Sequence, residues 1–378
     1  MLWQAHPLSS PLSVPTGRAE AEGQGIALAD RNRKEQAMGN KIGLLERLEK
    51  GPVLVAEGYV FELERRGHIK AGPFVSEVVL DYPEAVKMLH REFLWAGSEV
   101  MVALTYYAHR DKLRVIGREE ELEALNRQAV QLAQEVAAEG DALVAGNISN
   151  TWVYDHTQHD ETSRLVREMY EEQVGWAVDE GVDLVIAETL SYLGEALIAL
   201  EVIKQAGLPS VITLGSVPDQ TQDGYPYEEA CKILVDNGAD VVGLNCSRGP
   251  WTLLPIVERI RKAVDGYVAA LPVAYRTTEA HPTMQSLREQ GQRSFPIALD
   301  PFAHTRFEMA DFAAQARELG VNYIGICCGA APHHVRAMAE ALGREVPASR
   351  YSPDLSLHPM IGSQVKAKDQ PFLEGWKD

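Results

Sequence analysis

The sequence has few cysteines, no excess of positive charge and no long apolar run, and each shortage excludes a class of protein. Four cysteines in 378 residues are too few for a disulfide scaffold. They favour a reducing compartment and predict a cytoplasmic protein. The 36 basic and 54 acidic residues give a net charge of −18, which argues against nucleic acid or an anionic membrane as a partner. No apolar run approaches the roughly 20 residues of a membrane-spanning helix.

Glycine-rich phosphate-binding turns are also missing. Neither G-x-G-x-x-G nor G-x-x-x-x-G-K-[ST] occurs, which counts against nucleotide chemistry. The sequence does contain short apolar runs, typical of strands buried on both faces, that alternate with amphipathic helical patterns. Eight such units in one chain predict a (β/α)₈ TIM barrel, with a doubly wound open sheet as the alternative. The predicted strands are Val53–Ala56, Val100–Thr105, Ala142–Gly146, Leu184–Ala187, Ser210–Leu214, Val241–Leu244, Leu271–Ala274 and Tyr323–Ile326.

The chain divides into three predicted parts. Residues 1–40 have neither apolar periodicity nor the core of a signal peptide, so we expect a disordered N-terminal extension. Residues 41–343 hold the strand–helix units and should form the barrel. Residues 344–378 contain four prolines and little periodicity. We expect an extended C-terminal tail that wraps the barrel or reaches a neighbouring subunit, which leaves a homo-oligomer open.

Three of the four cysteines follow predicted strands, at the rim where barrels hold their active sites. Cys246 follows the sixth strand, and Cys327 and Cys328 follow the eighth. Three thiolates at one rim would select Zn²⁺ and leave a fourth ligand position open, as catalytic zinc sites do. Adjacent cysteines reach one ion only if the chain turns sharply, which Gly325 and Gly329 could permit. Inert buried cysteines are the alternative, because no short C-x-x-C motif is present.

Further candidate residues follow other strands. Glu188, directly after the fourth strand, should point into the barrel mouth in a catalytic or ammonium-binding role. Aromatic residues near the rim could cage a cationic methyl group, although ordinary packing is the alternative: Tyr59, Phe74, Tyr106 and Tyr107. The other residues that we expect to bind substrate are Glu57, Gly58, Asn147 and Thr189. The fourth cysteine, Cys231, lies in a helical pattern and is expected to be a core thiol.

Two motifs resemble the zinc signature of the homocysteine S-methyltransferase family: Asn245-Cys246 and Gly325-Ile326-Cys327-Cys328-Gly329. The similarity spans about residues 42–342. It is closest to the betaine–homocysteine branch, through segments that include Phe61–Gly67, Lys70–Pro73, Leu89–Phe93 and Glu139–Gly146. The resemblance implies a barrel with Zn²⁺ on Cys246, Cys327 and Cys328. It also implies methyl transfer from a small onium donor, a quaternary ammonium or a sulfonium, to homocysteine, giving methionine.

The sequence departs from the pattern of that family at several positions. The turn after the first strand, usually Asp-Gly, reads Ala56-Glu57-Gly58, so Glu57 either holds the homocysteine ammonium together with Glu188 or points elsewhere. Thr189 and Phe74 replace the tyrosine and the tryptophan usual in the betaine branch. Betaine is the first choice of donor, and another betaine, dimethylsulfoniopropionate and S-methylmethionine stay open. A different thiol acceptor, or a zinc-binding barrel without catalysis, are the remaining hypotheses.

Overall fold

The computed structural model describes residues 41–217, 219–358 and 362–363. The predicted N-terminal extension and the last part of the predicted tail, residues 364–378, lie outside the described residues. From Gly43 onward the described chain forms one unit around an eight-stranded parallel sheet. The strands are β1 (Val53–Ala56), β2 (Val100–Val102), β3 (Leu143–Ser149), β4 (Leu184–Leu190), β5 (Ser210–Gly215), β6 (Val241–Asn245), β7 (Tyr267–Leu271) and β10 (Tyr323–Ile326).

The strand order shows that the sheet is a barrel. The order is β1-β10-β7-β6-β5-β4-β3-β2. The first strand of the barrel, β1, is therefore paired with the last, β10, and the other end of the order is β2, the strand that follows β1 in the chain. Beside β2 the barrel closes through Glu99, whose N–H donates to the Leu54 carbonyl over 2.8 Å. The Ala56 N–H also donates to the Ser98 hydroxyl over 3.2 Å. The predicted (β/α)₈ barrel is therefore confirmed, and the open doubly wound sheet is excluded.

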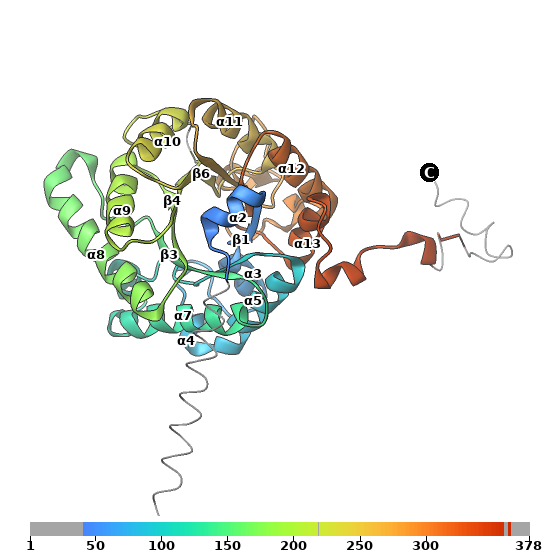
Figure 1. Cartoon of the computed structure of the whole chain (residues 1–378), viewed down its shortest axis with the longest axis horizontal. Helices are drawn as coiled ribbons and strands as arrows, with labels where there is room; N and C mark the ends of the chain where they lie inside the picture. The colour runs from blue at the N-terminus through green and yellow to red at the C-terminus, as the bar shows by residue number, and fades with distance from the viewer. Residues whose placement is uncertain (1–40, 218, 359–361, 364–378) are drawn as a thin grey trace, which may run out of the picture. The chain divides into compact units, whose positions relative to one another are not determined.

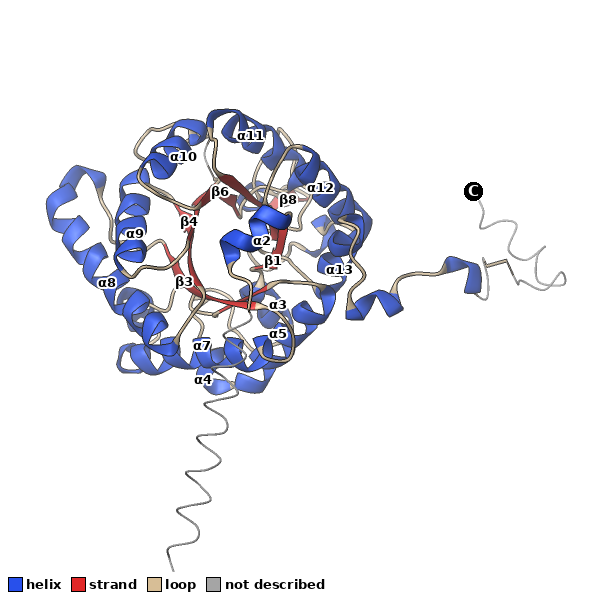
Figure 2. Cartoon of the chain, in the orientation of Figure 1, coloured by secondary structure: helices blue, strands red, loops and turns tan. Residues whose placement is uncertain are grey.

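Helices surround the strands and bury the barrel on its outer side (Figures 1 and 2). Each helix turns an apolar stripe inward, as α5 does with Val86, Leu89 and Phe93, all fully buried. The helices are α2 (Leu44–Lys50), α3 (Tyr59–Arg65), α4 (Val78–Asp81), α5 (Pro83–Ala96), α6 (Arg110–Val115), α7 (Leu122–Ala137), α8 (His159–Glu180), α9 (Leu193–Gln205), α10 (Tyr227–Asp236), α11 (Pro250–Ala263), α12 (Arg306–Glu318) and α13 (Pro332–Ala341). None of the described helices is both long and apolar enough to cross a membrane.

The seventh strand lies earlier than the sequence pattern predicts. The prediction was 271–274, whereas β7 spans Tyr267–Leu271. Pro272 ends the strand because proline has no N–H for the sheet. The apolar run misled the prediction because Val273 and Ala274 are also fully buried. They lie in the long connection from β7 to α12, which also contains a small hairpin, β8 (Arg288–Glu289) and β9 (Gln292–Arg293).

The described beginning of the predicted tail packs on the barrel. Arg344 hydrogen-bonds to Glu99 and to the Pro52 carbonyl, and Val346 packs against the core. Two short 3₁₀ turns follow, at Pro347–Tyr351 and Leu355–Leu357. Where the barrel ends and the tail begins stays a prediction.

Candidate active site

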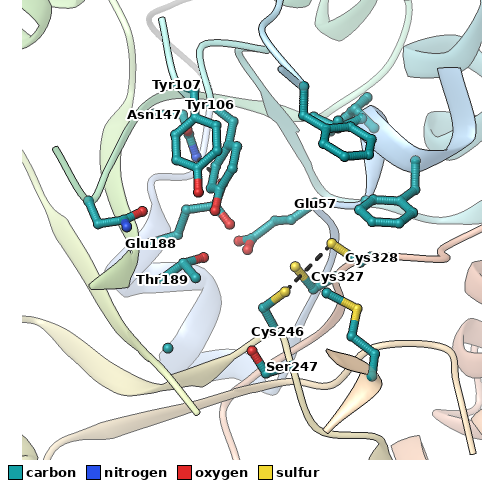
Figure 3. A pocket seen from close by; sticks show the side chains of 18 of the residues that line it. Glu57, Tyr106, Tyr107, Asn147, Glu188, Thr189, Cys246, Ser247, Cys327 and Cys328 are labelled. Atoms are coloured by element: carbon teal, nitrogen blue, oxygen red, sulfur yellow. Dashed lines mark hydrogen bonds between the residues drawn. The ribbon is translucent and has the colours of Figure 1, made fainter. Parts of the chain in front are cut away.

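The carboxyl ends of the strands surround one pocket, seen in Figure 3. It collects residues from the ends of seven strands and from the connection after β7, which lie far apart in the sequence. Every residue predicted to bind substrate or metal lines it: Glu57, Gly58, Tyr59, Phe74, Tyr106, Tyr107, Asn147, Glu188, Thr189, Cys246, Cys327 and Cys328. Their presence in one pocket satisfies the geometric requirement of the prediction, while the role of each stays a prediction. Cys231 lies elsewhere, fully buried in α10 as a core thiol.

Left-handed backbone is concentrated at this pocket. Among the described residues, seven other than glycine have positive φ, and all but Gln290 line the pocket. The six are Phe74, Tyr107, Trp152, Thr189, Cys246 and Ser247, with φ between 51° and 63°. Such conformations cost free energy and persist where the surrounding fold enforces them, commonly at functional sites. Here they turn the chain back at the strand ends and direct side chains into the barrel mouth.

The three cysteine sulfur atoms lie within 4.8 Å of one another. The Cys246 and Cys328 Sγ atoms are 3.5 Å apart (Figure 3). A tetrahedral zinc with Zn–S bonds of about 2.3 Å sets its sulfur ligands about 3.8 Å apart. The cluster therefore fits a soft metal held by three thiolates, with the pocket on its open side. No other set of three potential ligand side chains comes together in the described chain.

The two glycines beside the cysteine pair have different roles. Gly329 has φ of +82° and lies in the turn directly after the two cysteines, a conformation open to glycine. Gly325 makes no turn, so that part of the prediction is wrong. It lies inside β10, where a Cβ would come within 2.6 Å of the Leu271 and Val55 side chains. Gly58 likewise permits a close approach, because a Cβ there would lie 2.3 Å from the Cys327 carbonyl oxygen.

Glu188 is held by two amide side chains, one from the adjacent strand β3 and one from β6, two strands away on the other side. Asn147 donates to one carboxylate oxygen over 2.7 Å, and Asn245 donates to the other over 2.9 Å. Asn245 also donates to the Thr189 hydroxyl over 2.8 Å and accepts from the Thr189 N–H over 2.9 Å. Burial raises the pKa of Glu188 to about 8, partly offset by these hydrogen bonds. The carboxylate is thus rigidly placed but short of positive charge.

Glu57 shares the pocket, and its carboxyl group has no hydrogen-bond partner among the described residues. Both of its carboxylate oxygens are buried without a hydrogen bond. Burial, and then the nearby charges of Glu188 and Cys246, raise its pKa well above the usual range. The pocket holds three further unpaired acceptors, the side-chain carbonyl oxygens of Asn147, Asn150 and Gln285. An excess of buried acceptors suits a ligand that brings hydrogen-bond donors and positive charge, such as an ammonium group.

Aromatic rings form the other side of the pocket. The Tyr106 and Tyr107 ring centroids are 4.2 Å apart, and Phe74 stacks on Phe61 with centroids 5.3 Å apart. Tyr59 differs from these rings. It begins α3, is buried, and its hydroxyl meets His90 Nδ1 at 3.1 Å in the core. Tyr59 can therefore present only its ring to the pocket. Its predicted role in substrate binding is then limited to contacts made by the ring.

Several pocket residues were not singled out as site residues by the sequence reasoning. Trp152 lies just after β3, with its ring centroid 6.4 Å from that of Tyr107. In the sequence, the sign of this role is the position of Trp152 two residues after the asparagine at the end of that strand. Ser247 is signalled by its neighbour Cys246. Met284, Gln285 and Phe295 come from the long connection after β7, whose sequence carries no periodic pattern that could reveal them.

Comparison with known proteins agrees with this geometry. A family model described as Homocysteine S-methyltransferase matches residues 55–342. Betaine--homocysteine S-methyltransferase 1 of Danio rerio is 39% identical over 89% of this chain and 84% of that protein. An S-methylmethionine--homocysteine S-methyltransferase of Rattus norvegicus is 36% identical over 87% of this chain and 89% of that protein. The metallated homocysteine methyltransferase MmuM of Escherichia coli shares the fold, with a TM-score of 0.61 and 20% identity over 78% of this chain and 97% of MmuM.

Proposed function

The chain belongs to the homocysteine S-methyltransferase family, and from this premise we propose a zinc-dependent enzyme that uses a small onium donor, betaine as first choice. Homocysteine is the methyl acceptor and methionine the product. The observation that carries the proposal is the three-sulfur cluster facing a pocket with an unpaired buried carboxylate. Homocysteine has a thiol that must become a thiolate, which a metal on the sulfur cluster would favour. It also has an ammonium group, which the buried carboxylate would bind.

We assign the metal ligands to Cys246, Cys327 and Cys328. A bound zinc would lower the pKa of the homocysteine thiol and so provide a thiolate near neutral pH, where a free thiol with a pKa of about 8.5 is mostly protonated. Backbone hydrogen bonds to the sheet fix the loops that carry the cysteines, and these bonds therefore fix the ligand positions. The Cys246 N–H donates to the Leu271 carbonyl, and the Cys327 N–H to the Pro272 carbonyl, each over 2.9 Å.

We assign the amino group of homocysteine to the two buried carboxylates. Glu188 is oriented by Asn147 and Asn245, and Glu57 has both oxygens free to accept. An ammonium between them would favour the ionised carboxylates and lower both raised pKa values. Glu57 would then do the work of the aspartate that the family usually has after the first strand.

The aromatic side of the pocket would bind the donor. A cationic methyl group is attracted by the faces of Tyr106, Tyr107 and Trp152, which offer no competing nucleophile. In the reaction the acceptor sulfur bonds the methyl carbon while the carbon–nitrogen or carbon–sulfur bond of the onium breaks. The bonding electrons leave with a neutral product, so no general acid is needed. The protein's contribution is alignment of the two reactants.

Incubation with homocysteine and a panel of donors tests the proposal. Zinc-loaded protein should form methionine with glycine betaine, and the panel should include dimethylsulfoniopropionate and S-methylmethionine. Methionine from a sulfonium alone would correct the donor. No methionine from any donor, despite one bound zinc, would refute the enzyme and leave the non-catalytic zinc barrel. Transfer only to another thiol would correct the acceptor.

A pair of cysteine variants tests the metal assignment. Cys246→Ala should lose both zinc and activity, because two sulfurs remain where three are needed. Cys231→Ala is the matched control, since it removes a buried thiol from α10, outside the pocket. It should keep zinc and activity. Full activity in Cys246→Ala would overturn the metal mechanism.

The aromatic assignment is tested separately. Tyr107→Ala should raise the KM of the donor more than that of homocysteine, and equal effects on both would contradict the cage. A homo-oligomer and a reducing, cytoplasmic location remain predictions from the sequence.

A further inference from the structure

Lys112 lies against the aromatic side of the pocket. It belongs to α6, the short helix that follows β2. Its Nζ atom lies 4.4 Å from the ring centroid of Tyr107 and 5.3 Å from that of Trp152. Both rings line the pocket, and Trp152 is 63% exposed. Lys112 is not itself a lining residue, so its ammonium borders the pocket through these two rings.

This ammonium has no anionic partner among the residues that the structure describes. Several other lysines do have one: Lys50 pairs with Glu46, Lys204 with Asp240 and Lys232 with Asp236. Asp111, next to Lys112 in sequence, bonds instead to Arg114 over 2.6 Å. Lys112 is half-buried, and burial lowers its pKa. In the described part of the chain, the Lys112 ammonium therefore faces two aromatic rings of the pocket and no carboxylate.

We infer that Lys112 binds the carboxylate of a zwitterionic methyl donor and selects that class over donors without a carboxylate. The inference rests on the proposed function and names the substrate class of that same site. The rings attract the onium head, while the lysine attracts a carboxylate that is a few bonds away. A bare cation would have the same attraction to the rings but would meet the repulsion of the ammonium without a carboxylate to offset it. Selection therefore comes from attraction of one class and repulsion of the other.

Binding of two matched ligands tests the inference without any need for turnover. Glycine betaine and tetramethylammonium share a quaternary head and differ by the carboxylate. Calorimetric titration of zinc-loaded protein, with and without homocysteine, should show tighter binding of glycine betaine to the wild type. Lys112→Met should weaken glycine betaine about tenfold, the usual scale of a charge-assisted hydrogen bond. It should leave tetramethylammonium unchanged or bound more tightly.

Two further variants make the comparison specific. Lys112→Arg keeps the charge and should restore most of the glycine betaine affinity. Lys232→Met removes an exposed lysine of α10 and should change neither ligand. In steady-state assays, Lys112→Met should raise the KM for glycine betaine with a smaller change in kcat.

Each other result would overturn the inference. If Lys112→Met weakened the binding of both ligands equally, the lysine would only support the rings. If Lys112→Met bound glycine betaine more tightly than the wild type, the lysine would merely occupy the aromatic cage. Equal affinities for the two ligands in the wild type, or no binding of either, would also exclude it. Failure of the proposed function is distinct: it would be lysine-dependent betaine binding without methionine from any donor.

Discussion

Replacing Asn245 by alanine should destabilise the protein and disable the acceptor side of the pocket. Asn245 ends β6 and is fully buried. Its amide joins three groups at the ends of two strands, since it donates to the carboxylate of Glu188 and to the hydroxyl of Thr189 and accepts from the Thr189 N–H. Alanine removes these three hydrogen bonds and also a longer contact from the amide nitrogen to Cys327 Sγ at 3.9 Å.

The expected loss can be estimated from the groups left behind. One Glu188 oxygen and the Thr189 N–H lose their partners in a buried environment. Each orphaned buried group costs about 1–3 kcal/mol, so the variant should lose about 2–6 kcal/mol of unfolding free energy. That is a large part of the 5–15 kcal/mol that stabilises a typical domain.

Asn245→Asp separates shape from hydrogen-bond chemistry. An aspartate can still accept from the Thr189 N–H, but it faces the Glu188 carboxylate, where Asn245 Nδ2 now donates over 2.9 Å. One of the two carboxyl groups must keep a proton for the pair to coexist. This variant should therefore be less destabilised at pH 6 than at pH 9, whereas the alanine variant should lack that extra pH dependence.

Urea unfolding followed by tryptophan fluorescence, together with methionine formation by the zinc-loaded protein, measures both effects. Asn237→Ala is the control, because it removes an exposed asparagine that bonds only to the Ile233 carbonyl of its own helix end. The control should change stability by less than about 0.5 kcal/mol. An equally small change in Asn245→Ala, with activity retained, would refute the view that these bonds hold Glu188 in place.

Three further perturbations probe other parts of the site. Burial lowers the pKa of His90 to about 3 from 6.5, so the unfolded chain takes up the proton first and stability is lost as pH falls from 6.5 towards 3. His90→Gln should escape about 2 kcal/mol of this loss between pH 8 and pH 5 in urea unfolding, and parallel losses in both proteins would contradict the assignment. Gly329→Ala puts a Cβ 2.7 Å from the Tyr275 ring at a φ of +82°. It should cost about 1–3 kcal/mol and reduce bound zinc, whereas unchanged melting and metal content would exclude a special turn. Glu195 is buried, and one carboxylate oxygen accepts from the Thr151 N–H over 2.8 Å and the Thr151 hydroxyl over 2.7 Å. Because Thr151 directly precedes Trp152, Glu195 would position that ring. Glu195→Gln should raise the donor KM severalfold and leave the homocysteine KM unchanged, and a change in the homocysteine KM alone would contradict this positioning role.

The barrel could be predicted from the sequence because its strands are buried on both faces and short. Runs such as Val53–Ala56 and Tyr323–Ile326 coincide with β1 and β10. The same signal failed at β7, where burial continues past the strand into Val273 and Ala274. Hydrophobicity reports burial, and only the missing N–H of Pro272 marks where the ladder ends.

The pocket was predictable to the extent that its residues follow strands directly. Glu57 and Glu188 are the first polar residues after apolar runs, Cys246 is the second, and the barrel brings such positions together. Phe295 and Gln285 could not be found this way. They reach the pocket through the long irregular connection after β7, whose path is set by tertiary contacts such as the hydrogen bond from the Met284 N–H to the Ser247 carbonyl.

The composition of the pocket has a consequence for how the protein would select its ligands. Two carboxyl groups and three thiols face one buried space, and Glu57 and Glu188 both have raised pKa values. So many acidic groups cannot all ionise together in a medium of low polarity unless cations join them. A metal ion, an ammonium and an onium head would supply positive charge to the sulfurs, the carboxylates and the aromatic rings respectively. The acidic pocket is therefore incomplete by itself, and binding of each cation should favour the ionised groups that help to hold the next one.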